Sequence, residues 1–186
     1  MTIVVKVGGA LLAYPDRFDA VLHEIAAASR HVGILVVPGG GPFADAVRAV
    51  DARVGLSDDA AHWMAVLAMD QHAHLIAARM HGAVRVSRPD ECVVDPGAGP
   101  IPVLAPYRWL RQVDPVPHTW DVTSDSIAAW VAGAIGAQRL VLIKPPGAAG
   151  VVTDAFFARA LPAQVAAEVV PGDRIDTLRQ ALRSLS

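Results

Sequence analysis

The sequence predicts an α/β fold with a largely parallel β-sheet. Short β-branched runs bounded by glycine or proline alternate along the chain with helix-like patterns, an arrangement typical of parallel sheets. The first two runs each end in a glycine cluster, which is where an α/β protein often turns from a strand into a helix. A length of 186 residues suits one domain, so we expect residues 1–186 to form a single domain.

Hydrophobic runs and the residues that flank them locate the individual elements. The expected strands cover residues 3–7, 33–37, 83–87, 102–105 and 140–143. The expected helices cover residues 16–31, 42–53, 57–81, 124–136 and 173–185, and a short helix is expected around residues 107–112. Proline and glycine are frequent in residues 89–106 and 144–150, so we expect irregular loops there, apart from the strand at 102–105.

The helix at residues 57–81 has the clearest boundaries in the sequence. Ser57 can cap its N-terminus, Asp58 and Asp59 suit the positive end of the helix dipole, and Gly82 can end it. The helix is apolar on most of its surface, which indicates more apolar area than one domain face buries. We therefore expect a homodimer, in which this helix would take part.

His62 and Asp70 share one face of that helix and interrupt its apolar pattern. Polar groups in such a setting contact a ligand, bond to one another in the core or face solvent, and the sequence leaves these alternatives open. The neighbouring Trp63 and the methionines suit core or dimer packing. Surface positions are expected for the histidines that show no metal-ligand spacing, namely His23, His31, His72, His81 and His118.

Composition narrows the class of protein. The formal net charge is −2 and no block of like charges occurs, so nothing indicates a nucleic-acid partner. No apolar run approaches the roughly 18 residues of a membrane span, and the N-terminus lacks the pattern of a secretory signal. The single cysteine cannot form an internal disulfide. We expect a soluble, cytoplasmic protein that acts on a small molecule and has no membrane partner.

Two glycine turns suggest that this small molecule carries phosphate. Lys6 ends the first strand and is followed by Gly8 and Gly9, whereas Gly39, Gly40 and Gly41 follow the second strand. Glycines at such positions let backbone N–H groups approach an anion, and a lysine adds a positive charge. Glycines can also serve turn geometry alone. Because both turns follow parallel strands, they should meet at one edge of the sheet, where such folds bind ligands.

Two later segments fit the same chemistry. Thr123 or Ser124 can cap the helix that begins near residue 124, and Asp125 lies in its first turn. Asp125 would either compensate the helix dipole or orient a lysine at a phosphate site. Lys144 ends a strand as Lys6 does, and a second cation there would suit phosphoryl transfer, although a strand-end lysine is usually solvated.

Taken in order, these segments resemble the amino acid kinase family. The matching segments are Lys6-Val7-Gly8-Gly9, Gly39-Gly40-Gly41, Thr123-Ser124-Asp125-Ser126 before an alanine-rich helix, and Leu142-Ile143-Lys144 followed by Gly150-Val151. The resemblance spans nearly the whole chain. It implies a three-layer α/β/α sandwich with a mainly parallel central sheet, in a shortened form. It also implies an ATP- and Mg²⁺-dependent phosphotransferase.

The resemblance also implies roles for individual residues. Lys6, Asp125 and Lys144 would be catalytic, with Asp125 organising the two lysines. Phosphate or nucleotide would contact Gly8, Gly9, Thr123, Ser124 and Gly150. The phosphorylated substrate would contact Gly39, Gly40, Gly41, Arg48, His62, Asp70 and Asp121, where Arg48 would meet its phosphate and Asp70 or Asp121 its ammonium group. No residue is assigned as a metal ligand.

Residues 62–71 and 120–125 most resemble family members of methanofuran biosynthesis, which implies an aminomethyl-furanmethanol phosphate as the acceptor and its diphosphate as the product. Uridylate or isopentenyl phosphate remain alternative acceptors. A non-catalytic nucleotide- or oxyanion-binding module is a further alternative, because Pro146 and Ala149 depart from the usual nucleotide loop of the family.

Overall fold

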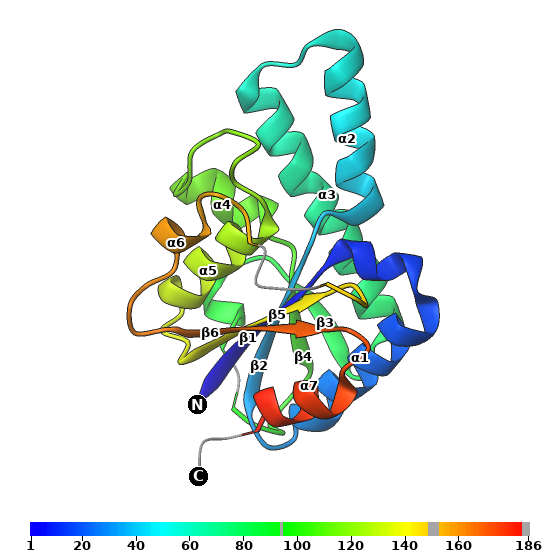
Figure 1. The fold of residues 1–186 in the computed structure, drawn as a ribbon. Coiled ribbons are helices and arrows are strands. Elements are labelled where there is room, and N and C mark those ends of the chain that lie inside the picture. The colour runs from blue at the N-terminus through cyan, green and yellow to red at the C-terminus, as the bar shows by residue number, and fades with distance from the viewer. Residues whose placement is uncertain (94, 149–152, 184–186) are drawn as a thin grey trace.

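Six parallel strands form the central sheet of the computed structural model, which describes residues 1–93, 95–148 and 153–183 (Figure 1). The strand order is β3-β4-β2-β1-β5-β6, and every pairing is parallel. β1 and β2 therefore lie side by side in the middle of the sheet, with β5 on the other side of β1. The strands are β1 (Thr2–Val7), β2 (Gly33–Pro38), β3 (Ala83–Val86), β4 (Ile101–Leu104), β5 (Arg139–Lys144) and β6 (Ala166–Pro171).

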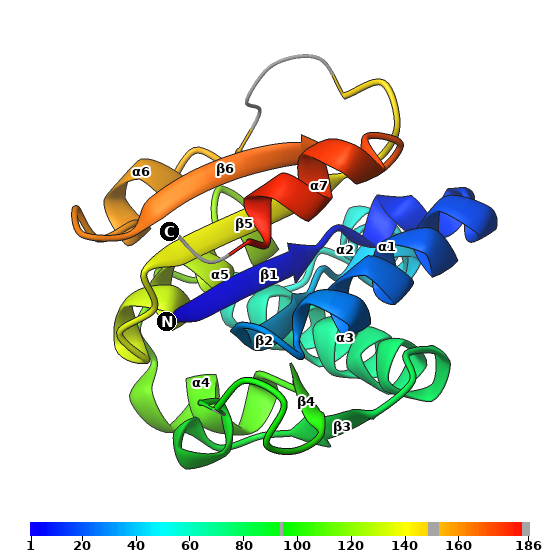
Figure 2. The same cartoon turned by 90° about the horizontal axis from the view of Figure 1, so that it is seen from below.

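Helices cover both faces of this sheet, as Figure 2 shows. They are α1 (Pro15–Ala28), α2 (Gly41–Val54), α3 (Asp58–Arg79), α4 (Tyr107–Val113), α5 (Ser124–Ala134), α6 (Phe157–Ala160) and α7 (Ile175–Ala181), with short 3-10 turns at Gly9–Ala13 and Pro89–Glu91. The predicted three-layer α/β/α arrangement with a parallel sheet is confirmed. Among the described residues, no helix combines the length and the hydropathy that crossing a lipid bilayer would require.

Side chains that alternate along the strands build one hydrophobic core on each face. Ile3, Val5 and Val7 of β1 pack with α1 and α7, whereas Val4 packs with α4 and α5 on the other face. Lys6 alternates with Val5 and Val7, so the strand directs it to the α5 face. The same alternation in β5 puts Lys144 on the face of Leu140 and Leu142.

The long helix α3 contributes to both cores. Its first half packs with the α5 face and its second half, around Ile76, with the α1 face. This explains why its apolar residues occur all round the helix. The Ser57 side chain accepts a hydrogen bond from the Ala60 backbone N–H at 3.2 Å, so the predicted N-cap is confirmed. α2 and α3 are joined by residues 55–57, and the pair projects beyond the sheet (Figure 1).

The sequence-based expectations were wrong for the elements near the C-terminal end. β6 was not predicted, because its residues 166–168 are exposed and two of them are alanines, which give little strand signal. The short α6 was also missed. α7 ends at Ala181, earlier than the predicted boundary at residue 185. In residues 89–106 the expected strand is confirmed as β4, and the remaining stretch, expected as irregular, contains a 3-10 turn at Pro89–Glu91.

Candidate active site

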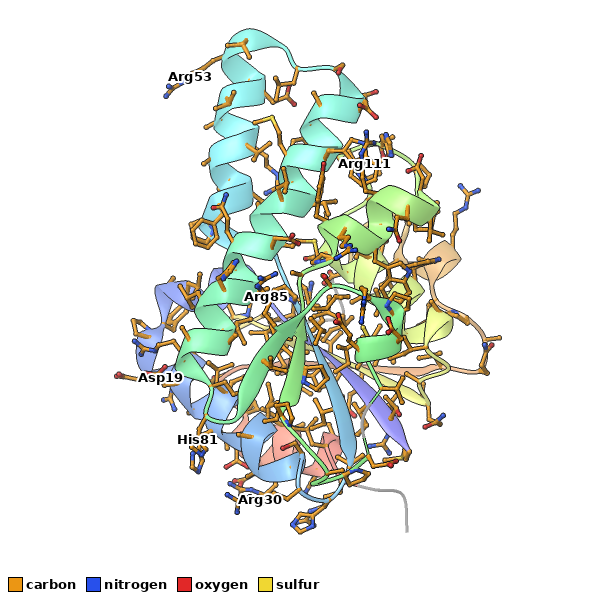
Figure 3. All side chains as sticks on the ribbon, turned by 180° about the vertical axis from the view of Figure 1, so that it is seen from behind. Asp19, Arg30, Arg53, His81, Arg85 and Arg111 are labelled. Atoms are coloured by element: carbon orange, nitrogen blue, oxygen red, sulfur yellow. The ribbon has the colours of Figure 1, made fainter. Side chains whose placement is uncertain are left out.

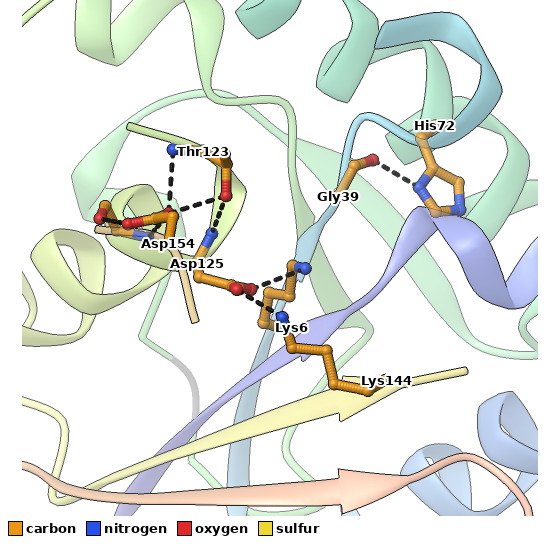
Figure 4. A network of polar contacts seen from close by, with 8 residues as sticks. Lys6, Gly39, His72, Thr123, Asp125, Lys144 and Asp154 are labelled. Atoms are coloured by element: carbon orange, nitrogen blue, oxygen red, sulfur yellow. Dashed lines mark hydrogen bonds and ion pairs between the residues drawn. The ribbon is translucent and has the colours of Figure 1, made fainter. Parts of the chain in front are cut away.

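Two lysines share one buried carboxylate at the carboxyl edge of the sheet (Figure 4). The Lys6 Nζ atom lies 2.8 Å from Asp125 Oδ1, and Lys144 Nζ donates to Asp125 Oδ2. Lys6 ends β1, Lys144 ends β5, and Asp125 lies in the first turn of α5. Asp125 therefore does more than compensate the dipole of its own helix, because it joins the ends of two neighbouring strands.

Burial determines the electrostatics of this cluster. Lys6 and Asp125 are 5% and 3% exposed, so both charges are removed from water. Burial lowers the pKa of Lys6, and the charge of Lys144 lowers it further, while Asp125 opposes both effects. Burial alone would raise the pKa of Asp125, but the two lysines hold that pKa below its usual value. The cluster thus keeps a carboxylate ionised between two ammonium groups.

Asp154 anchors the start of α5 and was not found from the sequence. Its Oδ2 atom accepts hydrogen bonds from the Thr123 backbone N–H at 2.9 Å, the Thr123 hydroxyl at 2.7 Å and the Ser126 backbone N–H at 3.0 Å. Its Oδ1 atom accepts a further bond from the Ser126 hydroxyl. Of the two predicted caps, Thr123 and Ser124, the structure has Thr123 as the N-cap, and its hydroxyl also accepts from the Asp125 N–H at 3.4 Å. Asp154 thereby fixes the turn that carries Asp125.

The two glycine turns meet backbone to backbone. A Cβ atom added to Gly9 would lie 2.2 Å from the Gly41 backbone, and Gly41 has a φ of +54°, so neither position has room for a side chain. The N–H groups of Gly9, Gly40 and Gly41 have no hydrogen-bond partner among the residues that the structure describes. Backbone N–H donors that lie close together in this way suit the oxygens of a phosphate group.

Gly8 and Gly39 have a different position in these turns. The Gly8 N–H donates to the Ile143 carbonyl at 3.0 Å and the Gly39 N–H donates to the Val7 carbonyl at 2.8 Å. Their donors hold the ends of β1, β2 and β5 together instead of facing a ligand. A Cβ on Gly8 would also lie 2.5 Å from the Ile143 carbonyl oxygen, so the close approach of β5 requires glycine there.

A cavity of about 230 Å³ opens beside the glycine turns. Gly9, Gly40, Gly41, Thr123 and Ser124 line it with backbone and hydroxyl groups. α2, α3 and α5 supply an apolar part, and exposed charged residues complete the lining at Asp45, Arg48 and Asp58. Lys6 is not part of this lining, but its Cε atom and the Ser124 hydroxyl both pack close to Gly39. The lysine cluster thus lies directly behind the cavity wall.

His62 belongs to the cavity wall and is buried. Its ring stacks on the His118 ring at 4.1 Å between centroids and meets the Trp63 ring edge-on at 4.7 Å. Burial, assisted by the neighbouring His118, lowers the pKa of His62 to about 4, so the imidazole is neutral at neutral pH. Its Nε2 atom has no hydrogen-bond partner within the described residues. His62 thus places a neutral imidazole in the cavity wall.

Two of the five histidines expected at the surface, His72 and His118, are not exposed. His118 is half-buried, and its ring nitrogens lie 3.0 Å from Asp59 Oδ1 and 2.8 Å from Asp114 Oδ1. His72 is completely buried, because it belongs to the inner side of α3. His23, His31 and His81 are exposed as expected. The Arg111 guanidinium, labelled in Figure 3, lies 4.6 Å from the centroid of the Trp63 ring.

Of three predicted substrate residues, Arg48 lines the cavity, whereas Asp70 and Asp121 do not. Arg48 lines the cavity, where it pairs with Asp45 at 2.9 Å and lies 4.8 Å from the centroid of the Trp120 ring. Asp70 does not line the cavity. Its carboxylate accepts a hydrogen bond from the Tyr107 N–H at 3.0 Å and so joins α3 to the start of α4. Asp121 is exposed and is also absent from the cavity lining.

The remaining predicted residue, Gly150, lies outside the described residues together with the rest of residues 149–152. Its expected contact with nucleotide stays a prediction. The carboxylates that the structure does bring to the cavity are Asp45 and Asp58, which the sequence did not single out as substrate residues. Asp58 was predicted only as a helix-dipole residue, because a first-turn aspartate has that local explanation.

Comparison with known proteins agrees with the fold. The sequence model of the amino acid kinase family matches residues 1–85. A curated relative, the [5-(aminomethyl)furan-3-yl]methyl phosphate kinase of Methanocaldococcus jannaschii, is 24% identical over 75% of this chain. The acetylglutamate kinase of Symbiobacterium thermophilum is 30% identical over 76% of this chain. The matched region spans 63% of the length of each of these relatives.

A solved structure has a similar fold over nearly the whole chain. The uridylate kinase of Archaeoglobus fulgidus superimposes with a TM-score of 0.72 at 16% identity, covering 98% of this chain and 95% of that one. At this identity the likeness concerns the fold. The family model over residues 1–85, the two relatives and the common fold all make the chain similar to the amino acid kinase family.

Proposed function

We propose that the protein is a small-molecule kinase that transfers the γ-phosphoryl group of ATP to a phosphate group of a small acceptor. The observation that carries the proposal is the pair of lysines on Asp125, close to a cavity lined by glycine N–H groups that have no partner among the described residues. Phosphoryl transfer depends mainly on positioning and on neutralising charge, and this arrangement supplies both. The relatives that the chain resembles are kinases by name.

In the proposed mechanism, an oxygen of the acceptor phosphate attacks the γ-phosphorus in line, and the bond from that phosphorus to the β–γ bridging oxygen breaks. Lys6 and Lys144 offset the charge on the oxygens during transfer, and Asp125 keeps the two ammonium groups from drifting apart. The N–H groups of Gly9 and Gly40 hold the equatorial oxygens. No side chain acts as a nucleophile.

The residues of this site fit a nucleotide whose Mg²⁺ ion would bind mainly to the phosphate groups of the nucleotide. Among the described residues, no group of three or more histidine, cysteine, aspartate or glutamate side chains could hold an ion. Mg²⁺ commonly keeps several waters and binds through substrate phosphates, so an all-protein cage is not required. When bound, the ion would neutralise charge between the phosphate groups. The chain itself would supply the positive charges of Lys6 and Lys144 to the phosphate oxygens.

We further propose aminomethyl-furanmethanol phosphate as the acceptor. The relative from Methanocaldococcus jannaschii is named for this substrate, and the cavity has matching chemistry. Arg48 suits the phosphate of the acceptor, the apolar part of the wall suits a flat ring, and Asp58 suits an ammonium group. Asp58 takes the place of Asp70 and Asp121, because the structure brings neither of those two carboxylates to the cavity.

A coupled assay for ADP release tests both proposals. The purified protein is incubated with ATP and Mg²⁺ and with one acceptor at a time: the aminomethyl furan phosphate, uridylate, isopentenyl phosphate or acetylglutamate. We expect turnover with the furan phosphate and a diphosphate product in the ³¹P NMR spectrum. Turnover with uridylate alone would overturn the choice of acceptor and leave the kinase proposal standing.

The Lys6→Ala variant serves as the negative control of that assay. Turnover should fall by orders of magnitude while circular dichroism shows an intact fold. Unchanged turnover would contradict the role of Lys6. If calorimetry shows tight binding of another anion but no binding of ATP or diphosphate, the non-catalytic binding module would replace the kinase.

The homodimer expected from the sequence stays a prediction. Met64 and Leu67 of α3 are 36% and 41% exposed, which leaves apolar surface on the projecting helix pair. Sedimentation equilibrium checks the prediction, and a monomer at micromolar concentration would contradict it.

A further inference from the structure

Buried His72 contacts the glycine turn without being part of the cavity lining. Its Nδ1 atom lies 2.6 Å from the carbonyl oxygen of Gly39, as Figure 4 shows. The side chain has no exposed surface, and its ring packs near Phe18 of α1 and Phe43 of α2, with centroid separations of 6.0 and 6.5 Å. His72 is absent from the cavity lining, whereas the neighbouring Gly40 is part of it.

The contact fixes both the proton and the charge of the imidazole. A carbonyl oxygen only accepts, so Nδ1 carries a proton. Nε2 is buried and has no partner among the described residues, which favours the neutral ring with its bare nitrogen at Nε2. Burial lowers the pKa of His72, and the charge of Lys6 lowers it further, while the Gly39 carbonyl opposes them. The ring therefore stays neutral at neutral pH.

The peptide between Gly39 and Gly40 is the group that His72 controls. In a trans peptide the carbonyl and the N–H of the next residue point in opposite directions, and no cis bond occurs among the described residues. A carbonyl that faces His72 turns the Gly40 N–H away from His72. Because both flanking residues are glycines, rotation of this peptide meets little steric resistance, and an external bond is needed to hold one orientation.

We propose that His72 is a positioning residue of the phosphate site, which anchors the Gly39 carbonyl through Nδ1–H and thereby aims the Gly40 N–H at the transferred phosphoryl group. The inference rests on the proposed function for the identity of that ligand. Without the anchor, the buried carbonyl loses its donor and the peptide samples orientations in which the Gly40 N–H no longer faces the cavity. His72 acts through the loop and does not contact substrate itself.

The tautomer of His72 tests the anchor without any assay of activity. A long-range ¹H–¹⁵N correlation spectrum at pH 7 should show a neutral ring with the proton on Nδ1, and the ring should become protonated only below the pH at which an exposed imidazole does. A proton on Nε2 alone would overturn the proposal, because the Gly39 carbonyl would then have no donor at its side.

Two variants separate the anchor from simple core packing. His72→Asn keeps an N–H donor near the position of Nδ1, whereas His72→Leu fills the core without a donor. Inorganic diphosphate is the probe, and the ¹⁵N-glycine amide of Gly40 is the readout. The amide signal should shift on titration in the wild type and in His72→Asn, and the shift should be lost or much reduced in His72→Leu.

Kinetics with ATP and the active acceptor supply the second readout. We expect kcat to fall at least about tenfold in His72→Leu while each KM stays within about threefold, because the loop acts mainly on the transition state. His72→Asn should recover most of the lost kcat. Ile76→Val, one turn further along α3 and fully buried, is the matched control and should leave kcat unchanged.

The possible outcomes are distinguishable. Equal losses in the Asn and Leu variants, in proportion to lowered thermal stability, would reduce His72 to a packing residue and overturn the inference. A wild-type protein that turns over no acceptor would count against the proposed kinase function. In that case the tautomer and the diphosphate titration would still decide the role of His72.

Discussion

The lysine cluster and the cavity wall on the projecting helices differ in how firmly they are held. Lys6 and Asp125 are buried, belong to a strand and a helix start, and satisfy one another's charge. Arg48 and Asp58 are exposed and belong to α2 and α3, the helix pair that projects beyond the sheet in Figure 1. The first group is supported by the protein core on both sides, and the second is supported by one helix pair.

This difference suggests that the two regions have different roles: the lysine cluster serves the chemical step, and the cavity wall serves recognition of the acceptor. Charge neutralisation at a reacting phosphorus requires atoms held within a fraction of an ångström, and strand ends provide that support. Recognition of the acceptor tolerates exposed side chains, whose replacement alters affinity more than the fold. Substitutions in the cluster should therefore affect turnover and stability together, while substitutions in the wall should affect the KM of the acceptor.

The largest effect is expected for Asp125→Asn. The change leaves two lysines without their carboxylate, one of them fully buried, which costs about 3–5 kcal/mol of unfolding free energy. Turnover should fall by roughly a thousandfold or more. Urea unfolding and ADP release measure the two effects. Asp16→Asn, at an exposed first-turn position of α1, is the matched control, and an equal loss there would refute the special role of Asp125.

Asp154→Ala should have the next largest effect. It removes the acceptor of four hydrogen bonds that fix the turn before Asp125, so we expect kcat to fall about tenfold to a hundredfold and stability to fall by about 1–3 kcal/mol. Asp154→Asn should lie between this variant and the wild type. If Asp154→Ala behaves like the exposed control Asp173→Asn, the turn does not depend on Asp154.

The lowered pKa of His62, a residue of the cavity wall, predicts that the stability of the folded protein depends on pH. Its pKa is about 4 in the folded protein and about 6.5 in an unfolded chain, so the unfolded state binds the extra proton between these values. The contribution of neutral His62 is therefore complete above pH 6.5 and is lost as the pH falls toward 4. Relative to His62→Gln, the wild type should lose on the order of 2 kcal/mol between pH 7 and pH 4.5.

The charged and titratable residues around His62 also affect its pKa. His118 stacks on the ring and disfavours its protonation, whereas Asp59 and Asp114 favour it. Denaturant titrations at several pH values measure the stability, and an NMR titration follows His62 directly. A midpoint near 6.5 for His62 in the folded protein would show that the wall is more open to water than the structure indicates.

The smallest effect is expected for Arg48→Met. Because Arg48 is exposed and already paired with Asp45, its loss should raise the KM of a phosphorylated acceptor by about tenfold or less, with kcat unchanged. The increase should shrink at high salt. Arg53→Met removes the same charge from the far end of α2 (Figure 3) and should leave KM unchanged. A fall in kcat for Arg48→Met would contradict the proposal that the cavity wall affects the KM of the acceptor and the lysine cluster affects turnover.

The order of the first elements and the two glycine turns could be predicted because their signals are local. β-branched runs specify buried strands, and consecutive glycines specify turns that need no partner elsewhere in the chain. The gathering of Lys6, Asp125 and Lys144 followed from their positions at strand and helix ends. β6 escaped prediction because an edge strand with exposed alanines lacks the alternation that marks a half-buried strand.

The sequence by itself determined the layered fold and the two glycine turns, since each depends on backbone geometry that a few neighbouring residues specify. It also put Lys6, Asp125 and Lys144 at strand and helix ends, which a parallel sheet brings to one edge. Only the tertiary structure revealed the support of that site. The bonds from His72 to Gly39, from Asp154 to Thr123 and from Asp70 to Tyr107 join residues 33, 31 and 37 positions apart. A single histidine or aspartate carries no periodic signal of its partner, because that partner is brought near only when the sheet and helices pack.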